Sequence, residues 1–391
     1  MSKTNCLPTV IHLTGTYFPT SQNWVHTQLK YLERWKPIVI ANSTANLQSV
    51  EWKPDYYSRE DHLPYIWRKA DGAFRRVFGL HLSHYIAARR QDSEILHAHF
   101  GHRGWHALRL SHLLDIPLVT TFYGVDISRL PKQEPEWRHR YDTLFEEGDL
   151  FLVEGSNMGE QLEELGCPSR KIRVHHLGIE VDRYPCNPLC KHGDEKLRVL
   201  MAGRFVEKKG FIDGLKAFAR FLEQGGRGQL TIIGDANDSK SSQSVKSGLL
   251  RIVEEREMSG HVEFRGLVPK NELKKAYYRH HVLLSPSREA QSGDNEGGAP
   301  VTLIEAQATG TPVISTYHCD IPEVVRDGEA GYLVQERDIP ALTKALEDAS
   351  SPNWIRRAGR RAAEHIRAEY NANKCGKEKD KIYNKLREMG G

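Results

Sequence analysis

The sequence predicts an α/β fold of two domains, each built on a doubly wound parallel sheet and both facing a cleft. Short apolar runs alternate with helical stretches along the whole chain, which is typical of βαβ units whose strands are buried on both faces. The runs fall into two sets of about six. The chain has 391 residues, whereas single domains mostly hold ~100–200 residues.

Each apolar run marks an expected strand. In the first half the runs cover 9–15, 36–42, 94–100, 117–124, 150–156 and 172–178, and in the second half they cover 198–204, 229–235, 261–267, 281–287, 311–317 and 330–336. Between the two sets, proline, glycine and charged residues gather in a composition typical of a linker. We therefore expect an N-terminal domain over 1–185, a linker over 186–196 and a C-terminal domain over 197–365.

Composition narrows the class of protein. A net charge of +4 and a pI near 8.6 suit an anionic small ligand or a membrane surface, and they fall far short of the positive excess of a nucleic-acid binder. No apolar run approaches the ~20 residues of a membrane span, and the first residues lack a signal-peptide core. Six scattered cysteines indicate reduced thiols. We expect a cytoplasmic protein, with the inner face of the membrane as an open alternative.

The residues that follow each strand are the first candidates for a site, because open parallel sheets bind ligands beyond the carboxyl ends of their strands. After the strand at 198–204, Arg204 and Lys209 stand five residues apart, and Gly210 opens a helix. Cations beside a helix N-terminus are suited to binding a pyrophosphate. The alternative is an ordinary solvated loop.

A second candidate is the stretch DNEGGAPVTLIEAQATGTPVIS at 294–315. Gly297 and Gly298 would let the backbone approach a ligand closely, and Pro300 suits the first turn of a helix. The amides near Val301 and Thr302 would then be free to bind phosphate oxygens. Both segments therefore predict an anion site.

Glu305 is unusual because it lies in the first turns of an otherwise apolar helix. Burying a carboxylate is costly unless it is hydrogen-bonded, and each bond to a charged group contributes about 1.5 to 3 kcal/mol. The two hydroxyls of a ribose would satisfy it. A salt bridge or the dipole of the helix are the alternatives.

The stretches AGRFVEKKG, LTIIGD, VEFRGLV, LLSPS and EGGAPVTLIEAQATGTPVIS occur in this order. Over about 150 residues they resemble the C-terminal domain of retaining GT-B glycosyltransferases of family 4, most of all the colanic-acid and exopolysaccharide type. The resemblance implies two Rossmann-like domains and a C-terminal helix over 366–391 that crosses back to the N-terminal domain. It also implies a donor site in which Arg204 and Lys209 contact the diphosphate, Glu305 the ribose and the backbone of 266–268 the base. The expected donor-binding residues are Arg204, Lys209, Gly266, Leu267, Val268, Glu296, Gly297, Gly298, Ala299, Pro300, Val301, Thr302 and Glu305.

The sequence departs from this family in the spacing of two glutamates. The family usually has seven residues between its paired glutamates, whereas eight separate Glu296 from Glu305. Glu296 is the expected contact to the donor sugar, and Asp294 is the alternative.

Four histidines follow one another in EILHAHFGHRGWHAL at 94–108. His97 and His99 should share one strand face, and His102 and His106 one helix face. No carboxylate or thiol joins them, so a wall of the cleft is favoured over a zinc site. The family has a similar HAHFG segment without a metal.

The strand at 117–124 ends in Tyr123, and Asp126 follows. The family often has His-Gly-x-Asp at this point, with the histidine near the reacting sugar. A phenol with a pKa near 10 is a poor proton acceptor at neutral pH, so Tyr123 is expected to position a group by hydrogen bonding. For Asp126, an active-site role and a structural cap both remain open.

The segment after the first strand should form the acceptor loop. It lacks the GxGxxG of a nicotinamide-binding domain. The expected acceptor contacts are Thr16, Tyr17, Asn23, His26 and His99.

A helix is expected over 67–78, WRKADGAFRRVF. At ~100° per residue, Trp67, Phe74 and Phe78 lie on one face and the arginines and lysine on an adjoining arc. Such a helix suits an anionic lipid surface. The alternative is a surface helix that packs its apolar face on the sheet.

Together, these residues predict a retaining hexosyltransferase that moves a sugar from a nucleoside diphosphate, with UDP favoured by the resemblance, to a hydroxyl of a saccharide or lipid-linked glycan. No Asp-x-Asp motif occurs, so we expect no metal cofactor. Because the net charge is only +4, we also expect no nucleic-acid partner. The expected catalytic residues are Glu296, Tyr123, Asp126, Arg204 and Lys209. The alternatives are a non-catalytic sugar-nucleotide-binding subunit and a sugar-nucleotide epimerase.

Overall fold

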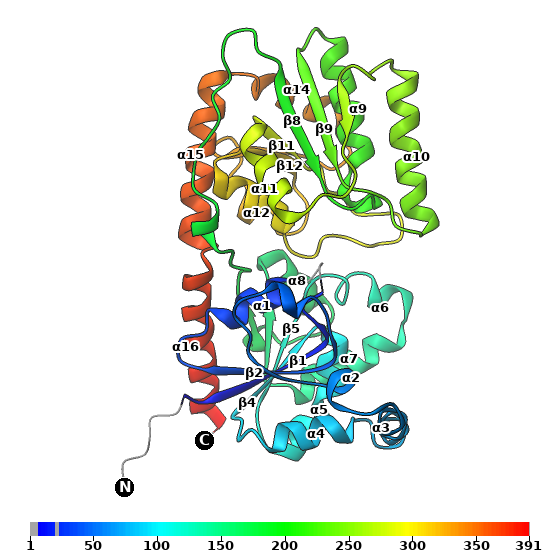
Figure 1. Ribbon diagram of the computed structural model, residues 1–391, viewed down its shortest axis with the longest axis vertical. Helices are drawn as coiled ribbons and strands as arrows, with labels where there is room; N and C mark the ends of the chain where they lie inside the picture. Colours follow the sequence, from blue (N-terminus) through cyan, green and yellow to red (C-terminus); the bar gives the residue numbers. More distant parts are fainter. Residues whose placement is uncertain (1–6, 20–22, 391) are drawn as a thin grey trace. The chain divides into compact units, whose positions relative to one another are not determined.

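The protein consists of two compact α/β units, seen in a computed structural model that describes residues 7–19 and 23–390 (Figure 1). The N-terminal unit runs to Glu180 and takes up the chain again at Asn371, and the C-terminal unit covers Val181–Tyr370. The expected linker over 186–196 therefore lies inside the C-terminal unit. The Asn187 amide donates to the Thr309 carbonyl at 2.8 Å, which ties this stretch to the second core.

The N-terminal unit holds a seven-stranded parallel sheet in the order β3-β2-β1-β4-β5-β6-β7. Its strands are β1 Thr9–Tyr17, β2 Lys36–Thr44, β3 Asp55–Ser58, β4 Ile95–His99, β5 Leu118–Thr121, β6 Leu150–Val153 and β7 Ile172–Val174. Its helices are α1 Asn23–Lys30, α2 Arg59–His62, α3 Tyr65–Phe78, α4 Leu82–Arg89, α5 Gly101–Leu114, α6 Leu130–Gln133, α7 Glu136–Glu147, α8 Ser156–Glu164 and α16 Ala372–Gly390.

The C-terminal unit holds a six-stranded parallel sheet in the order β10-β9-β8-β11-β12-β13. Its strands are β8 Leu197–Ala202, β9 Gly228–Ile233, β10 Val262–Phe264, β11 Val282–Leu284, β12 Val313–Thr316 and β13 Gly331–Val334. Its helices are α9 Phe211–Glu223, α10 Lys240–Glu255, α11 Lys270–Arg279, α12 Val301–Thr309, α13 Ile321–Val324, α14 Ile339–Asp348 and α15 Pro352–Glu369.

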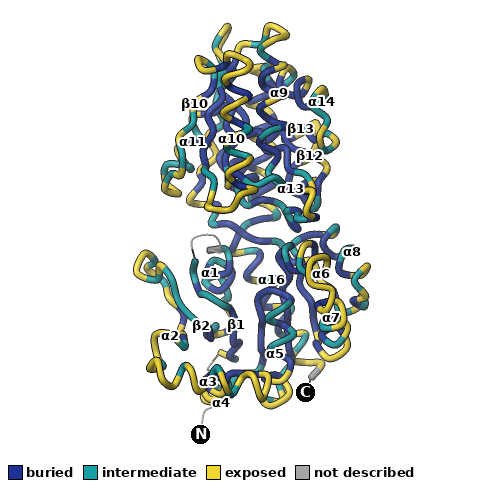
Figure 2. The backbone as a smooth tube through the Cα atoms, turned by 90° about the vertical axis from the view of Figure 1, so that its right-hand side faces the viewer, coloured by how far each residue is buried: buried dark blue, intermediate teal, exposed yellow. Residues whose placement is uncertain are grey.

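The central strands are buried on both faces, which confirms the prediction drawn from continuous apolar runs (Figure 2). One face of the N-terminal sheet is covered by α16, whose Tyr383 packs fully buried among Val10, Ile95 and Leu152. Strand β3 escaped prediction because its residues, DYYS, are mostly exposed at the edge of the sheet.

Strand order places a topological switch point in each sheet, between β1 and β4 and between β8 and β11. Ligands of doubly wound folds bind at such points, outside the carboxyl ends of the strands. In the C-terminal unit, the loops after β8 and β11 carry the two segments that the sequence singled out.

Candidate active site

Two lysines of the loop after β8 reach the loop that precedes α12. Lys209 Nζ lies 3.0 Å from Glu296 Oε2, and Lys208 Nζ lies 3.1 Å from Asp294 Oδ1 and 2.6 Å from the Asn295 carbonyl oxygen. The two anion-binding segments of the sequence are thus joined. Their cations are paired with carboxylates of this unit in the ligand-free protein.

Glu296 is held in a polar pocket of its own. Ser287 Oγ donates to Oε1 at 2.9 Å, and the side chain is only 6 % exposed. Burial opposes its ionisation, but Lys209 and Lys208 outweigh burial and lower the pKa of Glu296. The carboxylate is therefore ionised at neutral pH. It can exchange Lys209 for another cation, and Lys209 can exchange Glu296 for another anion.

His318 sets the backbone at this point. Its Nε2 accepts from the Glu296 amide at 3.3 Å, and its Nδ1 lies 2.6 Å from Glu336 Oε1, so Nδ1 carries the proton. The sequence reasoning missed His318 and Ser287. Ser287 is the last residue of the expected strand at 281–287 and His318 directly follows that at 311–317, so the strand-end rule could have found them.

Arg204 differs from the two lysines. It follows β8 on an exposed turn, and it has no ion pair among the residues that the structure describes. It is the free cation of this loop.

The glycine loop turns the chain into α12. Gly297 has a φ of 74°, in the left-handed region, and its amide donates to Asn295 Oδ1 at 2.9 Å. Pro300 stands at the N-cap of the helix, and Val301 begins it. The first amides of a helix lack intrahelical acceptors, so this end of α12 is suited to bind an anion. The donor contacts expected of 297–302 remain predictions.

Glu305 is 5 % exposed and has protein partners in the ligand-free state. Tyr184 donates to Oε1 at 2.8 Å, Tyr277 donates to Oε2 at 3.3 Å, and Lys270 Nζ lies 3.1 Å from Oε1. A salt bridge and two phenols thus satisfy the carboxylate. Lys270 is 60 % exposed and is the partner that a ribose could displace.

Three strands end side by side in glycines. The Gly203 amide donates to the Ile233 carbonyl, and the Gly234 amide donates to the Gly266 carbonyl. A Cβ at Gly234 would lie 1.8 Å from the Gly203 oxygen, so only glycine allows this approach. Leu267 in the next loop is exposed, and base binding by 266–268 remains a prediction.

In the N-terminal unit, Tyr123 follows β5 and its hydroxyl lies 2.6 Å from His99 Nδ1. His97 and His99 share a strand face and stack at 4.7 Å, as the alternation predicts. Both are fully buried, because α16 covers this face and Tyr383 bonds His97. The acceptor contact expected of His99 stays a prediction.

The cluster includes His12 of β1, which the sequence reasoning missed. Ring nitrogens of His12, His97 and His99 lie within 4.8 Å of one another, a spacing that could hold a metal ion. However, His12 Nδ1 bonds His99 Nε2 at 3.0 Å, and both nitrogens of His97 face hydroxyls, those of Tyr383 and Thr121. Hydrogen bonds between two of the rings, and from the third ring to hydroxyls, hold these side chains together.

Asp126 is fully buried and bonded to the backbone on both sides. Oδ2 accepts from the Gly101 amide at 2.7 Å and Oδ1 from the Tyr123 amide at 3.0 Å. Burial raises the pKa of Asp126 to about 6. These contacts fix the turn after β5 on the start of α5, and they are the structural cap that the sequence left open. The catalytic role stays a prediction.

The expected acceptor loop is partly described. Tyr17 and His26 are buried, and the Tyr17 hydroxyl lies 2.9 Å from His26 Nδ1; their acceptor contacts stay predictions. Thr16 is half-buried and bonds Ser43 at 2.9 Å. The side chain of Asn23 lies outside the described residues.

Two sequence families match the chain. The family described as glycosyl transferases group 1 matches residues 191–365, and glycosyltransferase family 4 matches residues 21–183. Each family covers most of one unit.

Two curated relatives match most of the chain. WcaL of Escherichia coli (strain K12), named for colanic acid biosynthesis, is 33 % identical over 286 residues, which are 71 % of this chain and 67 % of that protein. The amylovoran biosynthesis glycosyltransferase AmsK of Erwinia amylovora is 33 % identical over 67 % of this chain and 63 % of its own length. The chain thus spans about two thirds of these relatives.

Solved structures share the fold at low identity. HepE of Anabaena, solved with UDP and glucose, has a TM-score of 0.75 at 13 % identity and covers 96 % of this chain and 99 % of that one. A sucrose-phosphate synthase of Thermosynechococcus elongatus has a TM-score of 0.74 at 18 % identity and covers 98 % and 100 %. The chain is a glycosyltransferase of family 4, with two Rossmann-like domains of the GT-B class.

Proposed function

We propose that this protein moves a sugar, with retention of configuration and without a metal ion, from a nucleoside diphosphate to a hydroxyl of a saccharide or lipid-linked glycan. The relatives named for colanic acid and amylovoran biosynthesis support a role in exopolysaccharide assembly. The neighbour solved with UDP and glucose makes uridine the first base to test.

Two cations of the loop after β8, Lys209 and Arg204, carry the proposal. A departing diphosphate gains negative charge, and enzymes stabilise such charge with fixed cations and helix N-termini. Lys209 stands 3.0 Å from Glu296, and Arg204 is exposed beside it in the same loop. The diphosphate would take Lys209 from Glu296 and would gain Arg204, so that two cations do the work that a divalent ion does in other transferases.

We infer front-face attack in which the leaving phosphate accepts the proton of the acceptor hydroxyl. Tyr123 supports this reading, because burial raises its pKa well above the ordinary value of a phenol and it does not act as a base. Its hydrogen bond to His99 fixes the loop after β5.

Titration calorimetry with UDP, GDP and ADP in the presence of EDTA tests the donor site. One nucleotide should bind, and Lys209→Ala should weaken it about 10- to 100-fold, as the loss of ~1.5–3 kcal/mol from a charged hydrogen bond implies. Lys208→Ala is the matched control, because Asp294 and the Asn295 carbonyl hold Lys208. Binding of no nucleotide by folded protein would overturn the proposal.

Turnover separates the alternatives. Release of free UDP from UDP-glucose in the presence of an acceptor supports transfer. Nucleotide binding without turnover would instead indicate a binding subunit, and isomerised donor without free nucleotide would indicate an epimerase.

We also propose that α3 docks the protein on an anionic membrane. No helix among the described residues is long and apolar enough to cross a bilayer. Yet α3 is exposed along its length, with Ile66 72 % and Trp67 63 % exposed, and Asp71 is its one buried residue (Figure 2). The apolar face is therefore not packed on the sheet, which was the alternative.

Charge next to the apolar face completes the argument for lipid. Arg68, Lys69, Arg75 and Arg76 lie on the same helix, and each basic residue near an anionic surface contributes about 1 kcal/mol. Flotation with phosphatidylglycerol vesicles should carry the wild-type protein but not Ile66→Ser/Trp67→Ser. Equal flotation of both proteins would overturn this part of the proposal.

A further inference from the structure

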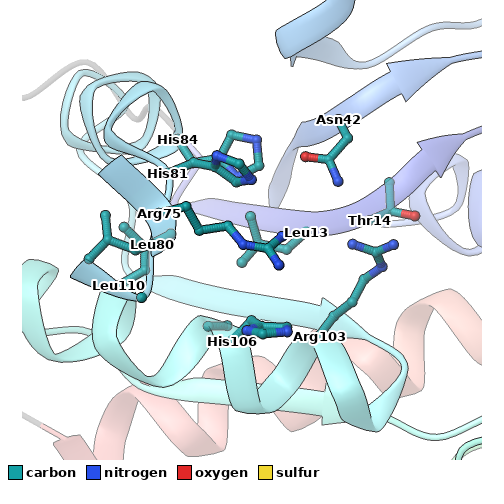
Figure 3. Close-up of a pocket in the computed structure, with 12 residues that line it drawn as sticks. Leu13, Thr14, Asn42, Arg75, Leu80, His81, His84, Arg103, His106 and Leu110 are labelled. Carbon is teal, nitrogen blue, oxygen red and sulfur yellow. The ribbon is translucent and has the colours of Figure 1, made fainter. Parts of the chain in front are cut away.

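A cavity lies within the N-terminal unit, between the sheet and three helices (Figure 3). Its volume is about 70 Å³, far below the ~300–1,000 Å³ of sites that hold a whole small molecule, so it suits a single small group. Leu13 and Thr14 of β1 and Asn42 of β2 form its floor, and side chains of α3, α4 and α5 converge on it. Of its lining residues, Arg75 is also used by the membrane proposal.

The charges around the cavity have one sign. Arg75 comes from α3 and Arg103 from α5, and His81, His84 and His106 also line the space. None of the 12 lining residues is acidic. Neither arginine forms an ion pair with a residue in the described part of the chain. Asp71 contacts His81 at 3.0 Å but does not line the cavity, and Arg59 also holds it at 2.7 Å.

Two of the histidines that line the cavity have a ring nitrogen that is unpaired within the described chain. His81 is 9 % exposed and His84 is half-buried, and the Nε2 atoms of both have no hydrogen-bond partner among residues 7–19 and 23–390. Buried polar groups in folded proteins are nearly always paired, so an unpaired set around a cavity indicates a missing ligand.

The backbone makes room for Arg103. A Cβ at Gly15 of β1 would lie 2.0 Å from Arg103 Nη2, so the guanidinium occupies the space that any other residue would fill. Burial and the nearby charge of Arg75 lower the pKa of Arg103. Two guanidinium groups, one of them on the exposed Arg75, thus line a cavity that has no acidic residue, and an oxyanion would offset their charge.

We propose that this cavity binds a phosphate group, and that it holds the phosphate of a phosphorylated acceptor. That the phosphate belongs to the acceptor rests on the proposed transfer to a glycan. Arginine side chains bind phosphate bidentately, and a neutral imidazole can add one N–H donor. Burial, Arg75 and Arg103 lower the pKa of His106 to about 4, so this imidazole is neutral near pH 7 and can be such a donor. His81 is not counted as a donor, because its Nδ1 lies 3.0 Å from Asp71 Oδ2 and so carries the proton of the neutral ring.

The same chemistry could come from a lipid phosphate or from a soluble sugar phosphate. Arg75 lies on α3, whose exposed apolar face we assign to the membrane, so the cavity opens next to a helix that would meet lipid.

Calorimetric titration of inorganic phosphate, with UDP at saturation to occupy the donor site, tests the site directly. Phosphate should bind the wild-type protein, and Arg103→Gln and Arg75→Gln should each weaken it at least tenfold. Arg109→Gln is the matched control, because Arg109 is an exposed residue of the same helix α5 that does not line the cavity. Circular dichroism and unchanged UDP binding establish that each variant is folded. Equal phosphate affinity in wild type and Arg103→Gln, or no phosphate binding at all, would overturn the proposal.

Vesicles then identify the source of the phosphate. If phosphatidic acid in phosphatidylcholine vesicles displaces inorganic phosphate, and Arg103→Gln abolishes this competition, the site takes a lipid phosphate. If the vesicles do not compete while glucose 1-phosphate does, the site takes a soluble sugar phosphate. If UDP binds but phosphate does not, the donor site stands and the cavity proposal fails.

Discussion

Replacing Glu296 by Gln should tighten the binding of UDP while it slows sugar transfer. In the ligand-free protein Glu296 holds Lys209 at 3.0 Å, and the side chains are 6 % and 16 % exposed. A diphosphate that takes Lys209 must break this charged hydrogen bond, which is worth ~1.5–3 kcal/mol. A glutamine would keep a neutral bond worth ~0.5–1.5 kcal/mol, so the cost of exchange falls by about 1–2 kcal/mol. Affinity should rise about 5- to 30-fold.

Titration calorimetry of UDP into the wild-type protein and Glu296→Gln measures this change. Asp294→Asn is the matched control, because it frees Lys208 rather than Lys209. Transfer should fall in the same Glu296→Gln protein if the carboxylate contacts the donor sugar, as expected. Unchanged or weaker UDP binding would refute the reasoning that Glu296 and the diphosphate compete for one lysine.

Three further outcomes follow from buried groups. Tyr184→Phe removes a bond to the buried Glu305 of α12 and should lower the free energy of unfolding, measured in urea, by ~1.5–3 kcal/mol. In the control Tyr278→Phe the lost bond joins an exposed hydroxyl to a carbonyl, so the free energy of unfolding should fall by less than ~1.5 kcal/mol. Equal losses in the two variants would contradict this prediction. Gly210→Ala would place a Cβ 1.8 Å from a carbonyl oxygen and should destabilise more than Gly225→Ala, which shares a positive φ but has open space, and thermal unfolding compares them. Burial lowers the pKa of Lys379 to about 7, so above that pH the unfolded chain binds more protons than the folded one. The free energy of unfolding should therefore rise toward pH ~10 by up to ~1.4 kcal/mol per pH unit, relative to Lys379→Met. If the two proteins show the same pH dependence in urea unfolding, this prediction fails.

Local patterns in the sequence predicted most of the fold. Buried parallel strands are continuous apolar runs, so each central strand could be located from its own residues. The edge strand β3 has no such run, and the end of the first unit at Glu180 depends on contacts of 181–190 with distant residues. Arg367, for example, donates to the Tyr184 carbonyl at 2.7 Å, a contact between residues far apart in the chain.

The candidate site divides in the same way. Lys209 and Glu296 were predicted because each lies in a motif with its own local signal. The partners of Glu305 were not, since Tyr184 and Lys270 come from separate segments that no spacing rule connects. His99 was placed on the correct strand face, but which face α16 would cover could not be read from the strand itself.

Every acidic group expected to contact the donor is already paired within the C-terminal unit. Glu296 has Lys209, Asp294 has Lys208, and Glu305 has Lys270. In the proposed donor complex, the diphosphate would take the place of Glu296 on Lys209, and a ribose would take the place of Lys270 on Glu305. Glu296 would keep its bond from Ser287, and Glu305 would keep those from Tyr184 and Tyr277, so neither carboxylate would lose all its hydrogen bonds. A bare phosphate could make only the first exchange, whereas a nucleoside diphosphate could make both. The free nucleoside, which lacks the diphosphate, should therefore bind far more weakly than the nucleotide.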